Sequence, residues 1–268
     1  MKADLHLHTR YSDGYNSVDE IIQMAVSKGL THIAITDHDN LVGYDEKKQK
    51  AEKAGLQITK ALEISARDYE TGKVVHVLGY NIKDEYPILR ICDPMKQARN
   101  DKAYQQVLGL KKLGYEIDYD HLYEHAKGYI FKQHIFELLY LSDQVESLFP
   151  SIHETMFRRG GELFFHMDYV DVVDAVKAIS DAGGYAVIAH PNQQNNIETV
   201  QRVVKYGLRG IEYNHISNSE EYKKIILEYA KKYKLFLTGG SDFHGKFDRR
   251  INEVGSHLSE ESGYRIFD

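Results

Sequence analysis

The stretch most informative for chemistry is the first one, where two histidines lie two positions apart. His6 and His8 fall within Ala3–Thr9, which the sequence predicts as a β-strand. Side chains at i and i+2 share one face of a strand with Cα atoms about 7 Å apart, so both imidazoles can bind one metal ion. Asp13 follows in a turn closed by Gly14 and can bring a carboxylate back over the strand end. The alternative is a solvated strand face, and only the rest of the chain can decide.

Histidines and carboxylates recur where the later predicted strands end. Each follows a short apolar, β-branched run, and His76 lies inside such a run. The carboxyl ends of parallel strands meet at one face of a closed sheet, where active sites form, so we expect these side chains to converge. Independent surface histidines would not collect at one end of every strand. The residues at strand ends are His6, His8, His38, Glu63, His190, Asp242 and His244.

Each later residue has a simpler interpretation when taken alone. His38 fits a turn, Glu63 a surface carboxylate and His190 a loop before proline. Asp242 and His244 together can cap a turn. Seven further histidines lack the strand-end placement, and we expect no role in the site for them. They are His32, His121, His125, His153, His166, His215 and His257.

The types of candidate ligand narrow the choice of metal ion. Imidazole and carboxylate without sulfur suit Zn²⁺, Mn²⁺ or Fe²⁺, and the single cysteine, Cys92, excludes a thiolate site. The candidates exceed the needs of one ion, so we expect two or three divalent ions, with Glu63 able to bridge a pair. Two ions about 3.5–4 Å apart clamp a phosphate and lower the pKa of a bridging water, and the resulting hydroxide attacks phosphorus. The negative charge that develops on the phosphoryl oxygens must then be stabilised by fixed positive groups.

Composition limits the class of protein and its partners. The chain has 268 residues, 42% of them hydrophobic and 28% charged, which suits one large domain or a domain with an insertion. A net charge of −6 provides no basic field and argues against long nucleic acid as a partner. No run of 18 apolar residues occurs, so we expect no membrane span. Asp4 and His6 interrupt any apolar run near the first residue, so no signal peptide is predicted, and we expect a cytoplasmic location.

Strand and helix patterns alternate through the first part of the chain. A capping box at Ser17 and Glu20 opens a helix. Alternation of this kind predicts parallel βα units in an α/β protein. The strands are predicted over Thr31–Thr36, Gln57–Leu62 and Val74–Tyr80.

The pattern changes in the middle of the chain, where only helical periodicities occur. We therefore predict a helical insertion over residues 94–164 within an α/β domain formed by 1–93 and 165–268. The first helix of the insertion is predicted over Met95–Leu113, directly after Pro94. Strands resume, with helices between them, at Tyr185–Ala189, Gly210–Tyr213 and Leu235–Thr238.

Laid out in order, these motifs resemble the PHP family, the polymerase and histidinol phosphatase family of metal-dependent phosphoesterases. The resemblance covers nearly the whole chain and implies a distorted, TIM-like (β/α)7 barrel with a trinuclear metal site. The matching segments are Asp4–Thr9, Ser12–Gly14, Ala34–Asp39, Leu62–Ser65, His76–Gly79, Ala189–Pro191 and Gly240–His244.

The same resemblance assigns ligands to three ions. It implies that the first ion is held by His6, His8, Glu63 and Asp242. The second would be held by Glu63, His76 and His190. The third would be held by Asp13, His38 and His244.

The helical insertion makes the chain similar to the stand-alone nucleotide phosphatases of this family. These act on 5′-nucleotides, on 3′,5′-bisphosphonucleotides or on short RNA from its 5′ end. By motif, Lys132 and Arg159 would grip phosphate, and His134 would donate a hydrogen bond or a proton. Lysine stands where that group more often has arginine, and a point charge cannot bind phosphate in a bidentate manner. For His134 the alternative is a helix-face histidine packed against tyrosines.

The function expected from the sequence is hydrolysis of a phosphomonoester of a small nucleotide by metal-bound hydroxide. Two alternatives keep the metal chemistry, namely a 5′–3′ exonuclease on short RNA and a histidinol-phosphate phosphatase, against which the insertion argues. A metal-binding structural module is a further alternative, against which the complete ligand set argues. The expected partner is a small phosphorylated substrate, and no protein partner is implied.

Overall fold

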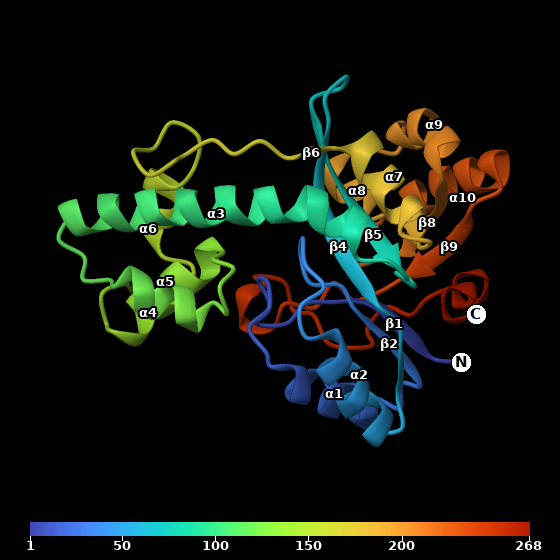
Figure 1. The fold of residues 1–268 in the computed structure, drawn as a ribbon, viewed down its shortest axis with the longest axis horizontal. Helices are drawn as coiled ribbons and strands as arrows, with labels where there is room; N and C mark the ends of the chain where they lie inside the picture. Colours follow the sequence, from blue (N-terminus) through green and yellow to red (C-terminus); the bar gives the residue numbers. More distant parts are fainter.

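The computed structural model describes residues 1–268 as two β-sheets covered by helices, with a helical lobe on one side (Figure 1). The first sheet is parallel and has the order β1 (Ala3–Leu7), β2 (His32–Ile35) and β3 (Gln57–Ile58). The second has the order β6 (Val170–Asp171), β4 (Ala61–Asp68), β5 (Lys73–Tyr80), β7 (Tyr185–Ile188), β8 (Leu208–Asn214) and β9 (Phe236–Gly239). The predicted α/β class is therefore correct.

The two sheets meet at two isolated parallel bridges. One joins Leu7 to Phe243 and the other joins His38 to Glu63. A hydrophobic cluster takes side chains from both sheets, among them Leu5 of β1 and Val187 of β7. The sheets thus share a core, but the hydrogen-bonded ladders are interrupted between them, and closure into a (β/α)7 barrel is not confirmed.

The expectation of parallel strands throughout is wrong for β5. This strand runs antiparallel to both β4 and β7. The reason lies in the connection from β4, which is a short turn ending at Gly72 with φ +73°. A parallel return needs a crossover of a dozen or more residues, and no such length of chain is present. The predicted strand Gln57–Leu62 is likewise divided, and β4 continues to Asp68, which places Glu63 inside a strand and not at its end.

Helices pack on the outside of the sheets. The predicted capping box is present at the start of α1, with Ser17 and Glu20 bonded reciprocally. The apolar face of α7 packs on β4, β5 and β7 within the largest hydrophobic cluster. The helices around the sheets are α1 (Val18–Ser27), α2 (Tyr44–Lys53), α7 (Val172–Asp181), α8 (Pro191–Gln194), α9 (Thr199–Val203) and α10 (Glu220–Tyr233), with 3₁₀ turns η1 (Val204–Tyr206), η2 (Gly245–Phe247) and η3 (Glu261–Phe267).

One long helix, α3 (Tyr86–Lys112), connects the sheets to the helical lobe (Figure 1). The sequence predicted that this helix starts after Pro94, but it begins two turns earlier and carries the proline inside. Ile88 and Cys92 pack into the main core, and this contact offsets the backbone hydrogen bond that Pro94 cannot donate. The far half of α3 packs in a separate core with α4 (Tyr119–His125), α5 (Lys132–Leu141) and α6 (Ser151–Met156).

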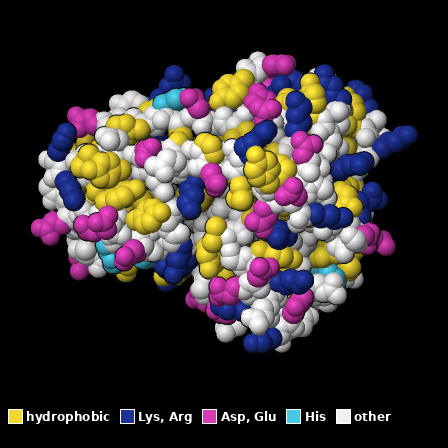
Figure 2. All heavy atoms as spheres, in the orientation of Figure 1, with side chains coloured by type: hydrophobic (Ala, Val, Ile, Leu, Met, Phe, Trp, Pro, Cys, Tyr) yellow, Lys and Arg dark blue, Asp and Glu magenta, His cyan; other side chains and the backbone are white.

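The first half of α3 packs in the main core and the second half in the separate core of the lobe. The change from one core to the other occurs close to the predicted domain boundary at residue 94. The division into 1–93 with 165–268 and an insertion over 94–164 stays a prediction, because α3 belongs to both parts. On the face in Figure 2, basic and acidic side chains are interspersed, and no continuous basic stripe crosses it. None of the helices combines the length and the apolar character that crossing a bilayer requires.

Candidate metal centre

The alternation of side chains along β1 places the two predicted histidine ligands on one face of the strand. Leu5 and Leu7 of β1 enter hydrophobic clusters, which leaves His6 and His8 together on the opposite face. The loop after β9 is tied to the same strand, since the N–H of Asp242 donates to the carbonyl of His6 at 2.8 Å. The strand and the loop therefore present their side chains at one place.

Glu63 lies at the centre of the cluster, and its carboxylate is buried. One oxygen is 2.9 Å from Nδ1 of His76 and 3.0 Å from Nε2 of His190. The other oxygen is 3.1 Å from Nε2 of His6 and 3.2 Å from Nε2 of His8. Four histidines from β1, β5 and the segment after β7 thus converge on one carboxylate, in the way that a bridging ligand requires.

Asp242 supplies a second shared carboxylate. Its Oδ1 lies 3.4 Å from Nε2 of His6, 3.3 Å from Nε2 of His8 and 3.5 Å from Nδ1 of His244. Asp242 and His190 both have positive φ, 54° and 24°, which costs free energy in residues other than glycine. Backbone strain at two candidate ligands is typical of positions that a site holds in place.

Asp13 reaches the cluster as predicted, but Gly14 serves a different purpose from the one expected. Oδ1 of Asp13 lies 3.3 Å from Nε2 of His244 and 3.9 Å from Nε2 of His38. Gly14 does not have positive φ. A Cβ at this position would lie 2.4 Å from the backbone carbonyl of His8, so glycine is needed because the turn packs directly on β1.

These side chains fit metal ions. Nε2 of His8 and Nδ1 of His38 are buried and make no hydrogen bond, although each lies near a carboxylate oxygen of Glu63, at 3.2 and 3.5 Å. Unpaired nitrogen donors aimed into a carboxylate cluster are the donor set that Zn²⁺, Mn²⁺ and Fe²⁺ accept. Four groups have ligand atoms that all lie within 4.8 Å of one another, namely His6, His8, Glu63 and Asp242; His8, Asp13, His38 and His244; His38, Glu63 and His76; and His6, Glu212 and His215.

The grouping matches one of the three expected sets and differs from the other two, and the group with Glu212 and His215 was not expected. The first set is identical, and the third gains His8. The second was expected to combine Glu63 and His76 with His190, whereas the compact group contains His38 in its place. Since Oε1 of Glu63 lies between His76 and His190, the assignment of individual ions stays a prediction.

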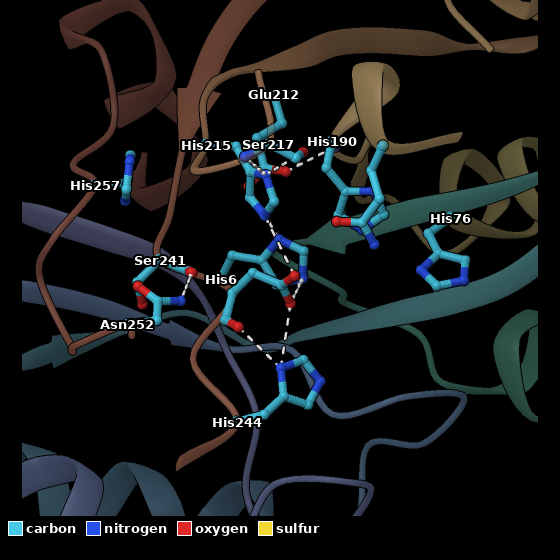
Figure 3. A network of polar contacts seen from close by, with 12 residues as sticks. His6, His76, His190, Glu212, His215, Ser217, Ser241, His244, Asn252 and His257 are labelled. Carbon is cyan, nitrogen blue, oxygen red and sulfur yellow. Dashed lines mark hydrogen bonds and ion pairs between the residues drawn. The ribbon is translucent and has the colours of Figure 1, made fainter. Parts of the chain in front are cut away.

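Glu212 and His215, on and just after β8, support the cluster and were not among the predicted residues. Glu212 is fully buried, and one of its oxygens accepts a hydrogen bond from Nδ1 of His6 at 2.9 Å. Nε2 of His215 lies 3.3 Å from Oδ2 of Asp242, so the expectation of no role for this histidine does not match its position. Figure 3 shows both side chains beside His6 and His190. His215 follows the predicted strand Gly210–Tyr213, and the strand-end argument, applied evenly, would have found it.

Burial and nearby negative charge shift the pKa values of the histidines in opposite directions, and the outcome differs between neighbours. Burial lowers the pKa of an imidazole, but at His8 the nearby carboxylates of Asp242 and Glu63 override it and raise the pKa to about 10. At His38 burial prevails and lowers the pKa to about 4. Burial would raise the pKa of Glu63, yet His6 and His38 hold it well below its usual value. The central carboxylate is therefore ionised and ready to bind cations.

A cavity of about 770 Å³ adjoins the cluster and shares Asp13, His38 and His76 with it. Lys132 and Arg159, the residues expected to grip phosphate, both line this cavity. Asp13 is its only acidic side chain. Its basic side chains are Arg99, Lys102, Lys132, Arg158 and Arg159.

His134 is buried and does not line this cavity. Its Nδ1 accepts a hydrogen bond from the N–H of Phe131 at 3.2 Å, and its Nε2 is buried without a partner. Burial and the nearby His125 lower the pKa of His134 to about 4, so the ring is neutral at neutral pH. Because Nδ1 is an acceptor, Nε2 carries the proton. The predicted catalytic role of His134 therefore depends on a donor that has no acceptor within the protein.

Comparison with known proteins identifies the family. The model of the PHP domain family matches residues 4–251, and the chain belongs to this family. A phosphoribosyl 1,2-cyclic phosphate 1,2-diphosphodiesterase from Eggerthella lenta is 33% identical over 258 residues, which is 95% of this chain and 98% of that protein. A 5′-3′ exoribonuclease from Haemophilus influenzae is 28% identical, over 96% of this chain and 94% of the relative.

Two further similarities bear on the substrate and the fold. A 3′,5′-nucleoside bisphosphate phosphatase from Chromobacterium violaceum is 28% identical over 90% of this chain and 86% of its own length. A crystal structure assigned as a metal-dependent phosphoesterase, from Bifidobacterium adolescentis, superposes with a TM-score of 0.87 and 26% identity, over 99% of this chain and 95% of that one. The protein is a metal-dependent phosphoesterase and thus a phosphoric ester hydrolase.

Proposed function

We propose that the protein hydrolyses a phosphoester of a small nucleotide or phosphorylated ribose. The observation that carries this proposal is the basic cavity that opens directly on the candidate metal cluster. Its volume of about 770 Å³ is in the range of sites for single small ligands. With a net charge of −6, the chain offers little general attraction for long nucleic acid.

The nine predicted ligands would hold two or three ions of Mn, Fe or Zn. Such ions polarise phosphoryl oxygens and lower the pKa of a bound water, which is the chemistry that ester hydrolysis needs. Glu63 and Asp242 are the residues suited to shared ligation, because each contacts several histidines. Asp13 lies at the boundary between the cluster and the cavity.

Lys132 and Arg159 would bind the phosphoryl oxygens from the cavity side. Neither side chain has a carboxylate partner, so both charges are free for a ligand. Lys132 is a compact charge and Arg159 a planar fork, and together they can contact different oxygens. We assign His134 the role of donor from Nε2, to a phosphoryl oxygen or to the leaving group.

A second candidate reaction is hydrolysis of a diester in a phosphoribosyl cyclic phosphate. The relative from Eggerthella lenta, at 33% identity, favours it. The exoribonuclease relative favours short RNA, whose terminal nucleotide also fits the cavity. Histidinol phosphate stays an alternative with the same metal chemistry.

The test is hydrolysis of a panel of substrates with Mn²⁺, measured as phosphate released from the monoesters and as products separated by chromatography for the cyclic diester and the RNA. The panel contains AMP, 3′,5′-bisphosphoadenosine, phosphoribosyl 1,2-cyclic phosphate, histidinol phosphate and a 5′-phosphorylated pentaribonucleotide. We expect turnover of a nucleotide or phosphoribosyl compound, lost in Asp13→Ala and retained in Asp120→Ala, a control on the exposed side of α4. Turnover of histidinol phosphate alone would overturn the substrate assignment, and no turnover with metal bound would overturn the enzymatic one.

A further inference from the structure

One face of α5 packs against the turn that carries Asp13. Gln133 and Glu137 lie four residues apart and therefore on the same side of this helix. Nε2 of Gln133 donates to Oδ2 of Asp13 at 3.3 Å, and Oε1 of Glu137 accepts a hydrogen bond from Nη2 of Arg10 at 2.9 Å. The helical lobe thus bonds directly to a predicted metal ligand and to the residue that opens its turn. Neither Gln133 nor Glu137 was among the predicted site residues.

The two oxygens of the Asp13 carboxylate face different parts of the protein. Oδ1 lies 3.3 Å from Nε2 of His244, whereas Oδ2 accepts the hydrogen bond from Gln133. A hydrogen bond to the outer oxygen fixes the plane of the carboxylate and keeps the inner oxygen directed at the cluster, as outer partners of metal ligands do. The compact group to which Asp13 belongs, the Asp13 group, consists of His8, Asp13, His38 and His244.

The other polar atom of Gln133 adds nothing to the stability of the fold. A carboxylate that binds metal can only accept hydrogen bonds, so the amide of Gln133 must turn its NH₂ group to Asp13. Oε1 of Gln133 is then buried without a donor. A buried acceptor without a partner costs free energy, and an apolar side chain such as methionine would avoid that cost. The contact with Asp13 therefore accounts for an amide that the stability of the fold does not explain.

Arg10 braces the same turn from one end to the other. Its Nε donates to the backbone carbonyl of Tyr15 at 2.7 Å, while its Nη2 is held by Glu137. Glu137 is buried, and its second oxygen lies 2.6 Å from Nε2 of His125 on α4. Burial would raise the pKa of Glu137, but His125 and Arg10 lower it, so the ion pair with Arg10 stays charged. Helices α4 and α5 thus hold the turn of Asp13 against the cluster.

We propose that Gln133 and Glu137 are positioning residues through which the helical lobe holds Asp13 as a ligand, so that the docking of α5 and the binding of an ion in the Asp13 group strengthen each other. Such a coupling is reciprocal, because each event favours the other by the same factor. The ion expected at His6, His8, Glu63 and Asp242 should be unaffected, since none of these residues bonds to α5. The inference rests on the metal binding in the proposed function and is independent of the substrate.

Gln133→Met tests the contact with Asp13, because methionine keeps the length of the side chain and removes both polar atoms. The matched control is Gln97→Met on α3, where an exposed glutamine donates to Asp101 at 2.8 Å. Calorimetry with Mn²⁺ added to the metal-free protein measures the affinities. We expect the affinity for one ion to fall by about 10- to 100-fold in Gln133→Met, with the other ions and the control bound as in the wild type. Unchanged affinity, or an equal loss for every ion, would overturn the inference.

A double-mutant cycle shows whether Gln133 acts through Asp13. Asp13→Ala alone should lose the ion of the Asp13 group, and adding Gln133→Met should then change the remaining affinities by less than about twofold. A merely structural role for Gln133 would lower the affinities by the same factor in both backgrounds and would overturn the inference. Glu137→Gln is the second variant and should lower the same affinity by about 3- to 10-fold, because it weakens the bond to Arg10. Unchanged affinity in Glu137→Gln would remove Glu137 from the proposal.

Hydrogen exchange measures the coupling from the side of the lobe. In the wild type, Mn²⁺ should slow the exchange of the backbone amides of α5, and Gln133→Met should remove most of that protection. Exchange of α5 that does not depend on Mn²⁺ in the wild type would overturn the coupling. If the wild type binds no Mn²⁺, the proposed function and this inference both fail. Binding of Mn²⁺ without turnover of any substrate would contradict the proposed function and leave the inference standing.

Discussion

The carboxylate of Glu212 accepts a hydrogen bond from Nδ1 of His6 at 2.9 Å, and both groups are fully buried. The second oxygen of Glu212 accepts a hydrogen bond from the backbone N–H of His190 at 2.7 Å. One carboxylate thus fixes the tautomer of one candidate ligand and the backbone of another. Nε2 of His6 is left free to face the cluster.

The first prediction concerns the hydrogen bond by which Glu212 positions His6. Glu212→Gln keeps the shape of the side chain but weakens the hydrogen bond to His6, so the affinity for Mn²⁺ should fall by about 10- to 100-fold. Competition with a chelating dye measures this affinity. Glu221→Gln, at an exposed position of α10, is the control and should bind metal normally. Unchanged affinity in Glu212→Gln would remove Glu212 from the site.

The second prediction concerns metal removal. Chelation leaves the ionised Glu63 and Asp242 buried with histidines and Arg250 as their charged partners, so the folded state loses the free energy of metal binding. At a metal concentration about 100 times Kd that term is about 2.7 kcal/mol, which corresponds to a fall in Tm of roughly 5–10 °C. Thermal unfolding with Mn²⁺ and with EDTA measures it. Glu63→Gln should show a much smaller difference between the two conditions, and an equal difference would contradict metal binding at this carboxylate.

Sequence patterns predicted which side chains converge in the candidate site because strand ends are encoded locally. The β-branched runs before His38 and His190 are confirmed as β2 and β7. The direction of β5 was not predictable from periodicity, since it follows from the short turn after Asp68 and not from the strand itself. Pro94 hid the true start of α3, because the core contact of Cys92 outweighs a local helix-breaking signal.

The cavity wall could not be predicted in the same way. Arg99 and Lys102 look like solvated charges on an amphipathic helix, and only the folded chain brings them opposite Phe131 and Phe164. Asp39 was visible in a motif, but its pairing with Arg99 spans sixty residues. Contacts of this kind depend on where two elements meet, which periodicity does not encode.

The third prediction concerns the turn that carries Asp13. In Gly14→Ala the added Cβ would lie 2.4 Å from the carbonyl of His8, so the turn must move away from β1. Forced repacking of this kind costs about 1–3 kcal/mol, and a displacement of about 1 Å at Asp13 should reduce kcat about 100-fold. Urea unfolding and initial rates measure the two effects. Gly55→Asn, at an open position with φ +78°, is the control. Full activity in Gly14→Ala would show that the site does not depend on this close approach.

The fourth prediction concerns the pH dependence of stability. The pKa of His134 is about 4 in the folded protein and 6.5 in the unfolded chain, because burial and His125 disfavour the charged ring. Between these values the unfolded chain binds more protons, so stability rises with pH and is lost as the pH falls from 6.5 to 4. The loss attributable to His134 is at most roughly 3 kcal/mol. Urea unfolding between pH 4.5 and 7.5 measures it. His134→Gln should flatten this dependence, whereas His121→Gln, at an exposed position of α4, should leave it unchanged. An unaltered pH dependence in His134→Gln would mean that folding does not shift the pKa of His134, and the buried neutral ring would be wrong.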